Sequence, residues 1–365
     1  MTSRDRVLAA GRSETVDRIP VTPYMGNYGA SLVGVPVDEY GADASTMADA
    51  QIAAQRLVDH DMLVAQSDGY YMAEALGMRT TRRPGTTPAP VGRPLANLAG
   101  VDTLAVADPW RDGRMPVYLE ALRTMRAAVG DRLAIRACGT GPFSLAGHLM
   151  GPDMLVTTIA TLSIEPDARV DRRLRLLMDV CTETAIAFAV AALESGADVV
   201  MSGDSLASLD MISPPIYEHW VWPYERHFFD CVRPHAEQRG ALTLLHICGN
   251  TVPILRSMAS TGAHVLEIDW KVPITTARDE TCCKPLMGNL DPTSVLLQGS
   301  PDEVLTASRR AIADGLLETD SGEPAAFLLG SGCEVAPATP VENVRAMVSA
   351  AHEPTAGPSA MDQRP

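Results

Sequence analysis

Positions 244–250 hold the run Leu244-Leu245-His246-Ile247-Cys248-Gly249-Asn250, an apolar segment that ends in two soft metal ligands and a glycine. Aliphatic residues from position 241 onward are typical of a short strand buried on both faces. Side chains two apart in a strand point the same way, so His246 and Cys248 can converge at its end. An imidazole and a thiolate aimed at one point suit zinc. Alone the pair is weak evidence, because buried histidines and cysteines are common in cores.

Helical segments, glycines and short buried strands alternate along the rest of the chain, which is the rhythm of a βα repeat. This pattern predicts a (β/α)8 TIM barrel, with one domain over 1–352 and an N-terminal helical extension. Residues 353–365 are expected to form a polar, disordered tail. The predicted strands are 18–23, 62–66, 132–137, 197–201, 241–246, 264–269, 285–288 and 326–330.

Three helix starts can be predicted from local sequence. Thr2 and Asp5 provide a capping-type start for a first helix. Ser300-Pro301-Asp302-Glu303 is a capping box with proline at the first helical position, and Thr339-Pro340-Val341-Glu342 repeats the signature.

Composition narrows the functional classes. The 365 residues are 46% hydrophobic and carry a net charge of −15, which argues against a nucleic-acid surface. We find no apolar run approaching the ~18 residues of a membrane span, so we expect a cytoplasmic protein without a membrane partner. Seven cysteines at irregular spacing do not look like a disulfide framework.

In a (β/α)8 barrel the chemistry lies on loops at the carboxyl ends of the strands, and candidate polar residues fall there. Asp68 and Asp204 could orient a substrate, with helix capping or loop hydrogen bonding as the equal alternative. His148 could contact substrate or simply cover the barrel mouth. The remaining candidates are Ser205, His246, Cys248, Glu267, Asp269, Asn289, Asp291 and Cys333.

Cys333 lies in the glycine-rich turn Gly330-Ser331-Gly332-Cys333 after the last predicted strand. Together with His246 and Cys248 it could complete a His-Cys-Cys set with an open fourth position, which is a catalytic rather than a structural arrangement of zinc ligands. The adjacent pair Cys282-Cys283 is a poorer candidate, because neighbouring side chains diverge on an extended chain.

The sequence also resembles a known family. The order His-x-Cys, acidic residue, distant Cys is similar to zinc-dependent, thiol-activating methyltransferases. Over about residues 1 to 352 the chain resembles the corrinoid-linked branch of the uroporphyrinogen decarboxylase superfamily, typified by methylcobamide:coenzyme M methyltransferase. The most specific matching stretches are Met287-Gly288-Asn289-Leu290-Asp291-Pro292 and Gly332-Cys333-Glu334-Val335-Ala336-Pro337. Others are 2–10, 17–21, 141–147 and 245–250.

Within that superfamily the sequence departs from the decarboxylases. Those enzymes carry an arginine-rich N-terminal motif, a tyrosine after the Gly-Pro-Phe segment and a histidine in the last glycine turn. Here residues 24–28 contain no arginine, His148 stands at the tyrosine position and the last turn is Gly330-Ser331-Gly332. A tetrapyrrole with many carboxylates needs arginines, so the resemblance favours the methyltransferases.

The resemblance implies a zinc ion held by His246, Cys248 and Cys333, which would lower the pKa of an acceptor thiol. The thiolate would take a methyl group from methylcobalamin carried on a separate corrinoid protein. Glu267 or Asp269 could fill the fourth zinc position, or could instead support His246 from behind. Asn289 and Asp291, in the matching motif, are candidate cofactor-binding residues.

Two alternatives from other classes remain open. The chain could be a decarboxylase-like lyase acting on a small carboxylate, or a non-catalytic subunit that binds a corrinoid protein. Three retained ligands speak against the second, because a scaffold has no physical need for them. The sequence does not identify the methyl acceptor, the direction of transfer or the oligomeric state.

Overall fold

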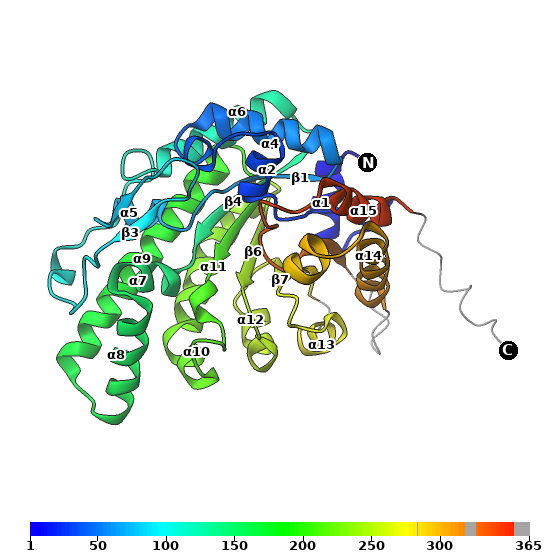
Figure 1. Cartoon of the computed structure of the whole chain (residues 1–365). Coiled ribbons are helices and arrows are strands. Elements are labelled where there is room, and N and C mark those ends of the chain that lie inside the picture. The colour runs from blue at the N-terminus through cyan, green and yellow to red at the C-terminus, as the bar shows by residue number, and fades with distance from the viewer. Residues whose placement is uncertain (283, 318–325, 354–365) are drawn as a thin grey trace.

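A computed structural model describes residues 1–282, 284–317 and 326–353. Parallel strands form a curled seven-stranded sheet in the order β1-β4-β5-β6-β7-β8-β9, with helices packed around it (Figure 1). The strands are β1 (Met62–Ala65), β4 (Ala134–Thr140), β5 (Val199–Gly203), β6 (Leu242–Ile247), β7 (Val265–Ile268), β8 (Leu286–Leu290) and β9 (Phe327–Ser331). The predicted (β/α) barrel is therefore confirmed.

The first predicted strand, 18–23, is wrong as a strand but right in position. Only Val21 forms a β-bridge, to Leu329 of β9. On the other side the Val21 carbonyl accepts a hydrogen bond from Asp61 N at 2.9 Å, next to β1. The segment thus lies between β9 and β1 and closes the ring. Pro20 and Pro23 have no N–H to donate, so no regular ladder can extend from Val21.

The longer helices follow the strands and pack on their neighbours, with α4 against α6, α9 against α11 and α14 against α15. Their bounds are α1 (Ser3–Ala10), α2 (Gly26–Leu32), α3 (Val37–Tyr40), α4 (Ala44–Val58), α5 (Tyr71–Ala75), α6 (Met115–Val129), α7 (Pro142–Met150), α8 (Pro152–Ile164), α9 (Ala168–Glu194), α10 (Pro214–Trp220), α11 (Trp222–Gln238), α12 (Leu255–Ser260), α13 (Ile274–Glu280), α14 (Pro301–Leu316) and α15 (Val341–His352).

Shorter elements complete the described chain. They are a hairpin of β2 (Arg79–Thr81) and β3 (Ala89–Val91), the 3₁₀ turns η1 (Val101–Thr103), η2 (Ser205–Ala207) and η3 (Val252–Ile254), and the π-helical turn η4 (Pro292–Leu297). The predicted tail from 354 onward lies outside the described residues, so the domain limit near 352 stays a prediction.

The barrel interior is a separate apolar cluster, distinct from the larger core between sheet and helices. Alternate strand residues such as Val64, Met201 and Leu244 point into it. Helix α1 adds Val7 and Leu8 to the same cluster and so covers the barrel interior from one side. The predicted Thr2 capping box is present at the start of α1, with Asp5 N 3.1 Å from Thr2 Oγ1.

Helix α9 contains a window long and apolar enough to cross a membrane, so the expectation that no apolar run approaches this length was wrong. In the folded chain 67% of that window is buried, against elements such as α11 and α7. A buried core helix passes the same length and composition test, so this helix is weak evidence for a membrane span.

Asp61 holds the closing segment in place. Its carboxylate is fully buried and accepts hydrogen bonds from Val21 N at 2.8 Å, Arg6 Nη1 at 2.9 Å and Arg18 Nη1 at 2.8 Å. Removing one partner from a buried ion network leaves uncompensated charge. We therefore expect Asp61→Asn to lower the free energy of unfolding by about 3 kcal/mol in urea titration.

The matched control is Asp131→Asn, because the Asp131 side chain is 83% exposed although it also pairs with an arginine. This variant should stay within about 0.5 kcal/mol of the native chain. Equal stability of the two variants would show that Asp61 does not anchor the ring closure.

Candidate functional site

Strand β6 positions the first two site residues. Its six residues are all buried, with Leu242 and Leu244 in the interior cluster. His246 continues this inward face and is 2% exposed. Cys248 follows two residues later, and Gly249 then turns the chain with φ 81°. A side chain at Gly249 would also collide with the carboxylate of Asp210.

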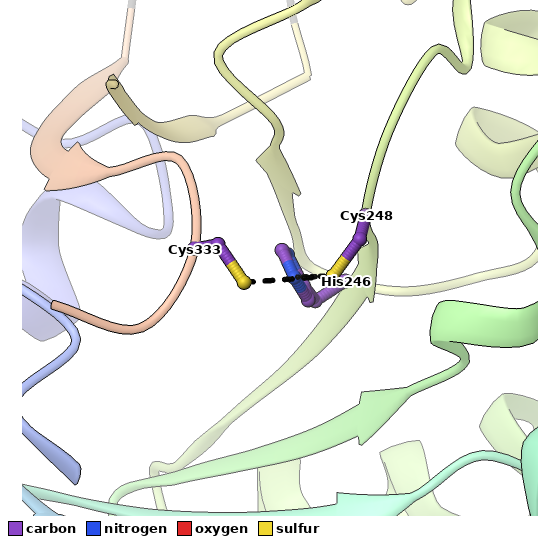
Figure 2. Close-up of side chains that lie close together, drawn as sticks. All are labelled: His246, Cys248 and Cys333. Carbon is purple, nitrogen blue, oxygen red and sulfur yellow. Dashed lines mark hydrogen bonds between the residues drawn. The ribbon is translucent and has the colours of Figure 1, made fainter. Parts of the chain in front are cut away.

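Cys333 reaches the same point from β9. Gly332 lies against the backbone of Trp270, where a Cβ would clash, so the turn after Ser331 requires glycine. Figure 2 shows Cys333 and Cys248 facing each other beside His246, with 3.6 Å between the two Sγ atoms. His246 Nε2 lies 3.1 Å from Cys248 Sγ. The three possible ligand atoms all lie within 4.8 Å of one another.

A buried ion pair supports the histidine from behind. Glu267 of β7 places Oε2 3.1 Å from His246 Nδ1. Both carboxylate oxygens of Glu267 also accept hydrogen bonds from Arg136 of β4, each at 2.6 Å. The side chains of Arg136 and Glu267 are both fully buried. This arrangement leaves Nε2 facing the cysteines and gives Nδ1–H an acceptor, as in carboxylate–histidine–metal triads.

The contact between the two thiols shifts their pKa values in opposite directions. The hydrogen bond from Cys333 lowers the pKa of Cys248, and the same contact raises the pKa of Cys333. Burial opposes protonation of His246, but the charge of Glu267 raises its pKa overall. A neutral imidazole and paired thiols are the donor types that bind zinc or another soft cation. Zinc binds cysteine as the thiolate and histidine as the neutral imidazole, so binding releases the protons of the two thiols.

A cavity of about 230 Å³ opens directly onto the three side chains. Its wall includes Tyr24, Gln66, Thr140, Ser144, His148 and Glu334. Burial raises the pKa of Glu334 to about 7. A ligand bound in this cavity would therefore contact the His-Cys-Cys cluster at one end and polar groups along its walls.

The two acidic candidates for a fourth ligand differ in position. Glu267 faces the Nδ1 side of His246, which matches the alternative of a supporting role. Asp269 is buried and its Oδ1 accepts a hydrogen bond from Lys271 N at 2.9 Å. Neither belongs to the close group of ligand atoms among the described residues. Their roles as fourth ligand stay predictions.

Asp204 caps the N-terminus of α7. Its carboxylate accepts hydrogen bonds from Phe143 N at 3.1 Å and Ser144 N at 2.6 Å. Burial raises its pKa to about 6. Asp68 is paired with Arg114 through contacts of 2.7 and 2.9 Å, and it also accepts a hydrogen bond from Tyr70 N. Both carboxylates are committed to neighbouring protein groups, as the capping and loop alternative expects.

His148 lies in the last turn of α7 and lines the cavity. Its ring packs against Tyr70 with 4.9 Å between the centroids. Burial lowers the pKa of His148 to about 4, and Nδ1 is buried without a hydrogen-bond partner. The structure thus places this residue where it can touch a ligand, and its catalytic role stays a prediction.

Asn289 and Asp291 lie at the carboxyl end of β8, outside the cavity that holds the cysteines. Asn289 Nδ2 donates to Val272 O at 2.6 Å and fastens the loop after β7. Asp291 caps η4 by accepting from Thr293 N at 2.8 Å. Both border a shallow depression near Trp270 rather than the cavity at the cysteines. A cofactor-binding role for them stays a prediction.

Three site residues were missed in the sequence. Arg136 stands inside a buried strand, and a charged residue within an apolar run signals a buried partner. Gln66 directly follows β1, where barrel loops begin. Glu334 adjoins Cys333 in a quoted motif. Of the cysteine pair predicted to be the poorer ligand candidate, Cys282 is exposed, and Cys283 lies outside the described residues.

The fold and the cluster together define a parallel (β/α) barrel with a thiol-rich site at the carboxyl ends of its strands. The chain belongs to the uroporphyrinogen decarboxylase (URO-D) family, whose pattern matches residues 2–354.

Relatives in this family include two kinds of enzyme with similar sequence identity to this chain. The chain is 28% identical over 354 residues to the methylcobamide:CoM methyltransferase MtbA of Methanosarcina acetivorans, covering 96% of this chain and 97% of that protein. It is 29% identical to the uroporphyrinogen decarboxylase of Anaeromyxobacter dehalogenans, covering 95% and 98%. A solved methyltransferase from Methanosarcina mazei superposes with a TM-score of 0.84 at 29% identity, covering 96% and 98%.

Proposed function

We propose that this chain is a zinc-dependent methyltransferase that moves a methyl group between a corrinoid carried by a partner protein and a thiol or similar acceptor. The single observation that carries the proposal is the His246, Cys248 and Cys333 cluster facing a cavity. The solved Methanosarcina mazei methyltransferase and the MtbA relative support this choice within the family.

The donor set fits zinc. One imidazole and two thiols, with all ligand atoms within 4.8 Å and lining the cavity, would supply three ligands to a zinc ion. Zinc bound there would supply a Lewis acid that lowers the pKa of an acceptor thiol. Glu267 and Arg136 would hold the His246 ring so that Nε2 stays aimed at the metal position.

The transfer conserves atoms and electrons. The acceptor loses its S–H proton to solvent, and its sulfur forms a bond to the methyl carbon. The methyl–cobalt bond breaks with its electron pair remaining on the corrinoid, which is a co-substrate. The cavity walls orient the acceptor and exclude water around its sulfur, which favours a reactive geometry.

The test is metal content followed by methyl transfer. We expect close to one zinc per chain under metal-replete, reducing conditions. Anaerobic incubation with methylcobalamin and a thiol should then convert the corrinoid to its demethylated form, followed by its absorbance. Protein without zinc, or zinc-loaded protein that leaves methylcobalamin intact with every thiol, would overturn the proposal.

A decarboxylase-like lyase is the second candidate, because the uroporphyrinogen decarboxylase of Anaeromyxobacter dehalogenans is 29% identical to this chain. The lyase and the methyltransferase can be distinguished with the same protein preparation, by adding small carboxylates in the absence of a corrinoid. Release of carbon dioxide would favour the lyase, and its absence together with thiol-dependent demethylation would favour the methyltransferase.

A further inference from the structure

The charges and hydrogen-bonding groups of the cavity limit which acceptor it can hold. Resting on the proposed function, we propose that the acceptor is a small thiol whose far end carries hydrogen-bond donors and no negative charge. An anionic thiol, such as the sulfonate coenzyme M named for several relatives, would then be a poor substrate.

No arginine or lysine lines the cavity in the part of the chain that the structure describes. Anionic head groups such as sulfonates and carboxylates are normally held by arginine or lysine, with arginine giving bidentate contacts. A buried anion without such a partner pays its desolvation cost uncompensated. The cavity therefore disfavours an acceptor with a negative end.

Two arginines near the cavity do not supply the missing positive charge. Arg136 lies beneath the cavity floor, with its guanidinium 4.4 Å from the centre of the Tyr24 ring, and its charge is matched by Glu267. Arg114 is matched twice, by Asp68 at 2.7 Å and by Glu74 at 2.7 Å. Both cations are held by carboxylates.

The walls offer acceptors instead. Gln66 Nε2 donates to Asp68 O at 3.2 Å, which leaves its Oε1 buried and without a partner. Glu334 Oε1 accepts from Asn27 N at 2.6 Å. No hydrogen bond to the second carboxyl oxygen of Glu334 is present within the described ranges. A neutral His148 offers a further acceptor or donor through its unpartnered Nδ1.

A buried acceptor without a partner favours a ligand that brings donors. A hydroxyl group, an amine or an ammonium group would satisfy Gln66 Oε1. A sulfonate or carboxylate brings only acceptors and cannot donate to Gln66 Oε1. The volume, about 230 Å³, is below the ~300 Å³ lower limit of drug-sized pockets, so the thiol must be short.

The experiment compares three thiols with one skeleton, 2-mercaptoethanol, cysteamine and 2-mercaptoethanesulfonate, on zinc-loaded native protein with free methylcobalamin. Rates are corrected for the uncatalysed reaction of each thiol. We expect kcat/KM for the neutral or the cationic thiol to exceed that of the sulfonate by about tenfold or more. Calorimetric binding of the three S-methyl products gives the same preference without turnover.

A charge-introducing variant provides an independent arm. Gln66→Lys places a cation on the cavity wall and should raise the relative kcat/KM for 2-mercaptoethanesulfonate by about tenfold. The control is Gln298→Lys, which makes the same change at an exposed position outside the cavity.

The outcomes separate the two proposals. A preference of the native protein for the sulfonate overturns the present inference and leaves the methyltransferase intact. If no thiol reacts, the methyltransferase fails, and the binding preference among the S-methyl compounds still decides the charge of the ligand. If Gln66→Lys does not fold, the native comparison alone decides.

Discussion

Cys333→Ala should abolish stoichiometric zinc binding and reduce thiol-dependent demethylation of methylcobalamin to the uncatalysed rate. The variant removes one of three ligand atoms that lie within 4.8 Å of each other and leaves only His246 and Cys248. Loss of a residue that merely supports a ligand costs about 10- to 100-fold in metal affinity, so direct loss of a ligand should cost more. Zinc is measured by elemental analysis after equilibration with a competing chelator.

The matched control is Cys231→Ala. Cys231 is also a half-buried free thiol, but it lies on α11 away from the cluster. It should retain native zinc and activity. Full zinc occupancy and affinity in Cys333→Ala would remove Cys333 from the ligand set and leave the mechanism without its third donor.

Arg136→Met should destabilise the chain by about 3–5 kcal/mol in denaturant titration, because it leaves the carboxylate of Glu267 buried without its main partner. The side chains of both residues are fully buried, and two hydrogen bonds of 2.6 Å join them. The same variant should weaken zinc binding about 10- to 100-fold, because Glu267 also orients His246.

The double variant Arg136→Met with Glu267→Gln tests whether the buried charge of Glu267 causes the loss of stability. Replacing the uncompensated carboxylate by an amide should recover part of the lost stability, because no buried charge then remains. It should not recover zinc affinity, since the amide is a weaker partner for His246 Nδ1. A double variant no more stable than Arg136→Met would show that packing, rather than buried charge, causes the loss.

Local sequence determined several features without help from the fold. The capping boxes at Thr2 and Ser300 both form, because their donors and acceptors lie within three residues of each other. The third capping signature is wrong. Pro340 itself occupies the N-cap of α15, and the Thr339 hydroxyl is buried without a partner.

The predicted strands were located by their apolar composition, and seven of the eight form within a few residues of the expected positions. The exception at 18–23 shows the limit of composition. Two prolines leave too few N–H groups for a ladder, and only the neighbours β9 and β1 show where the segment belongs.

The sequence by itself determined the barrel and the convergence of His246 with Cys248, because both follow from short-range periodicity of the backbone. Only the tertiary structure decided which residues stand behind and around that pair. Arg136, which the sequence did not single out, meets Glu267 across the barrel interior at a separation of 131 positions. The sequence left open whether Glu267 is a ligand or a support, and the contacts of Glu267 with Arg136 and with Nδ1 of His246 place it behind the histidine. Such contacts depend on strand order and ring closure, which bring together side chains that no local spacing connects.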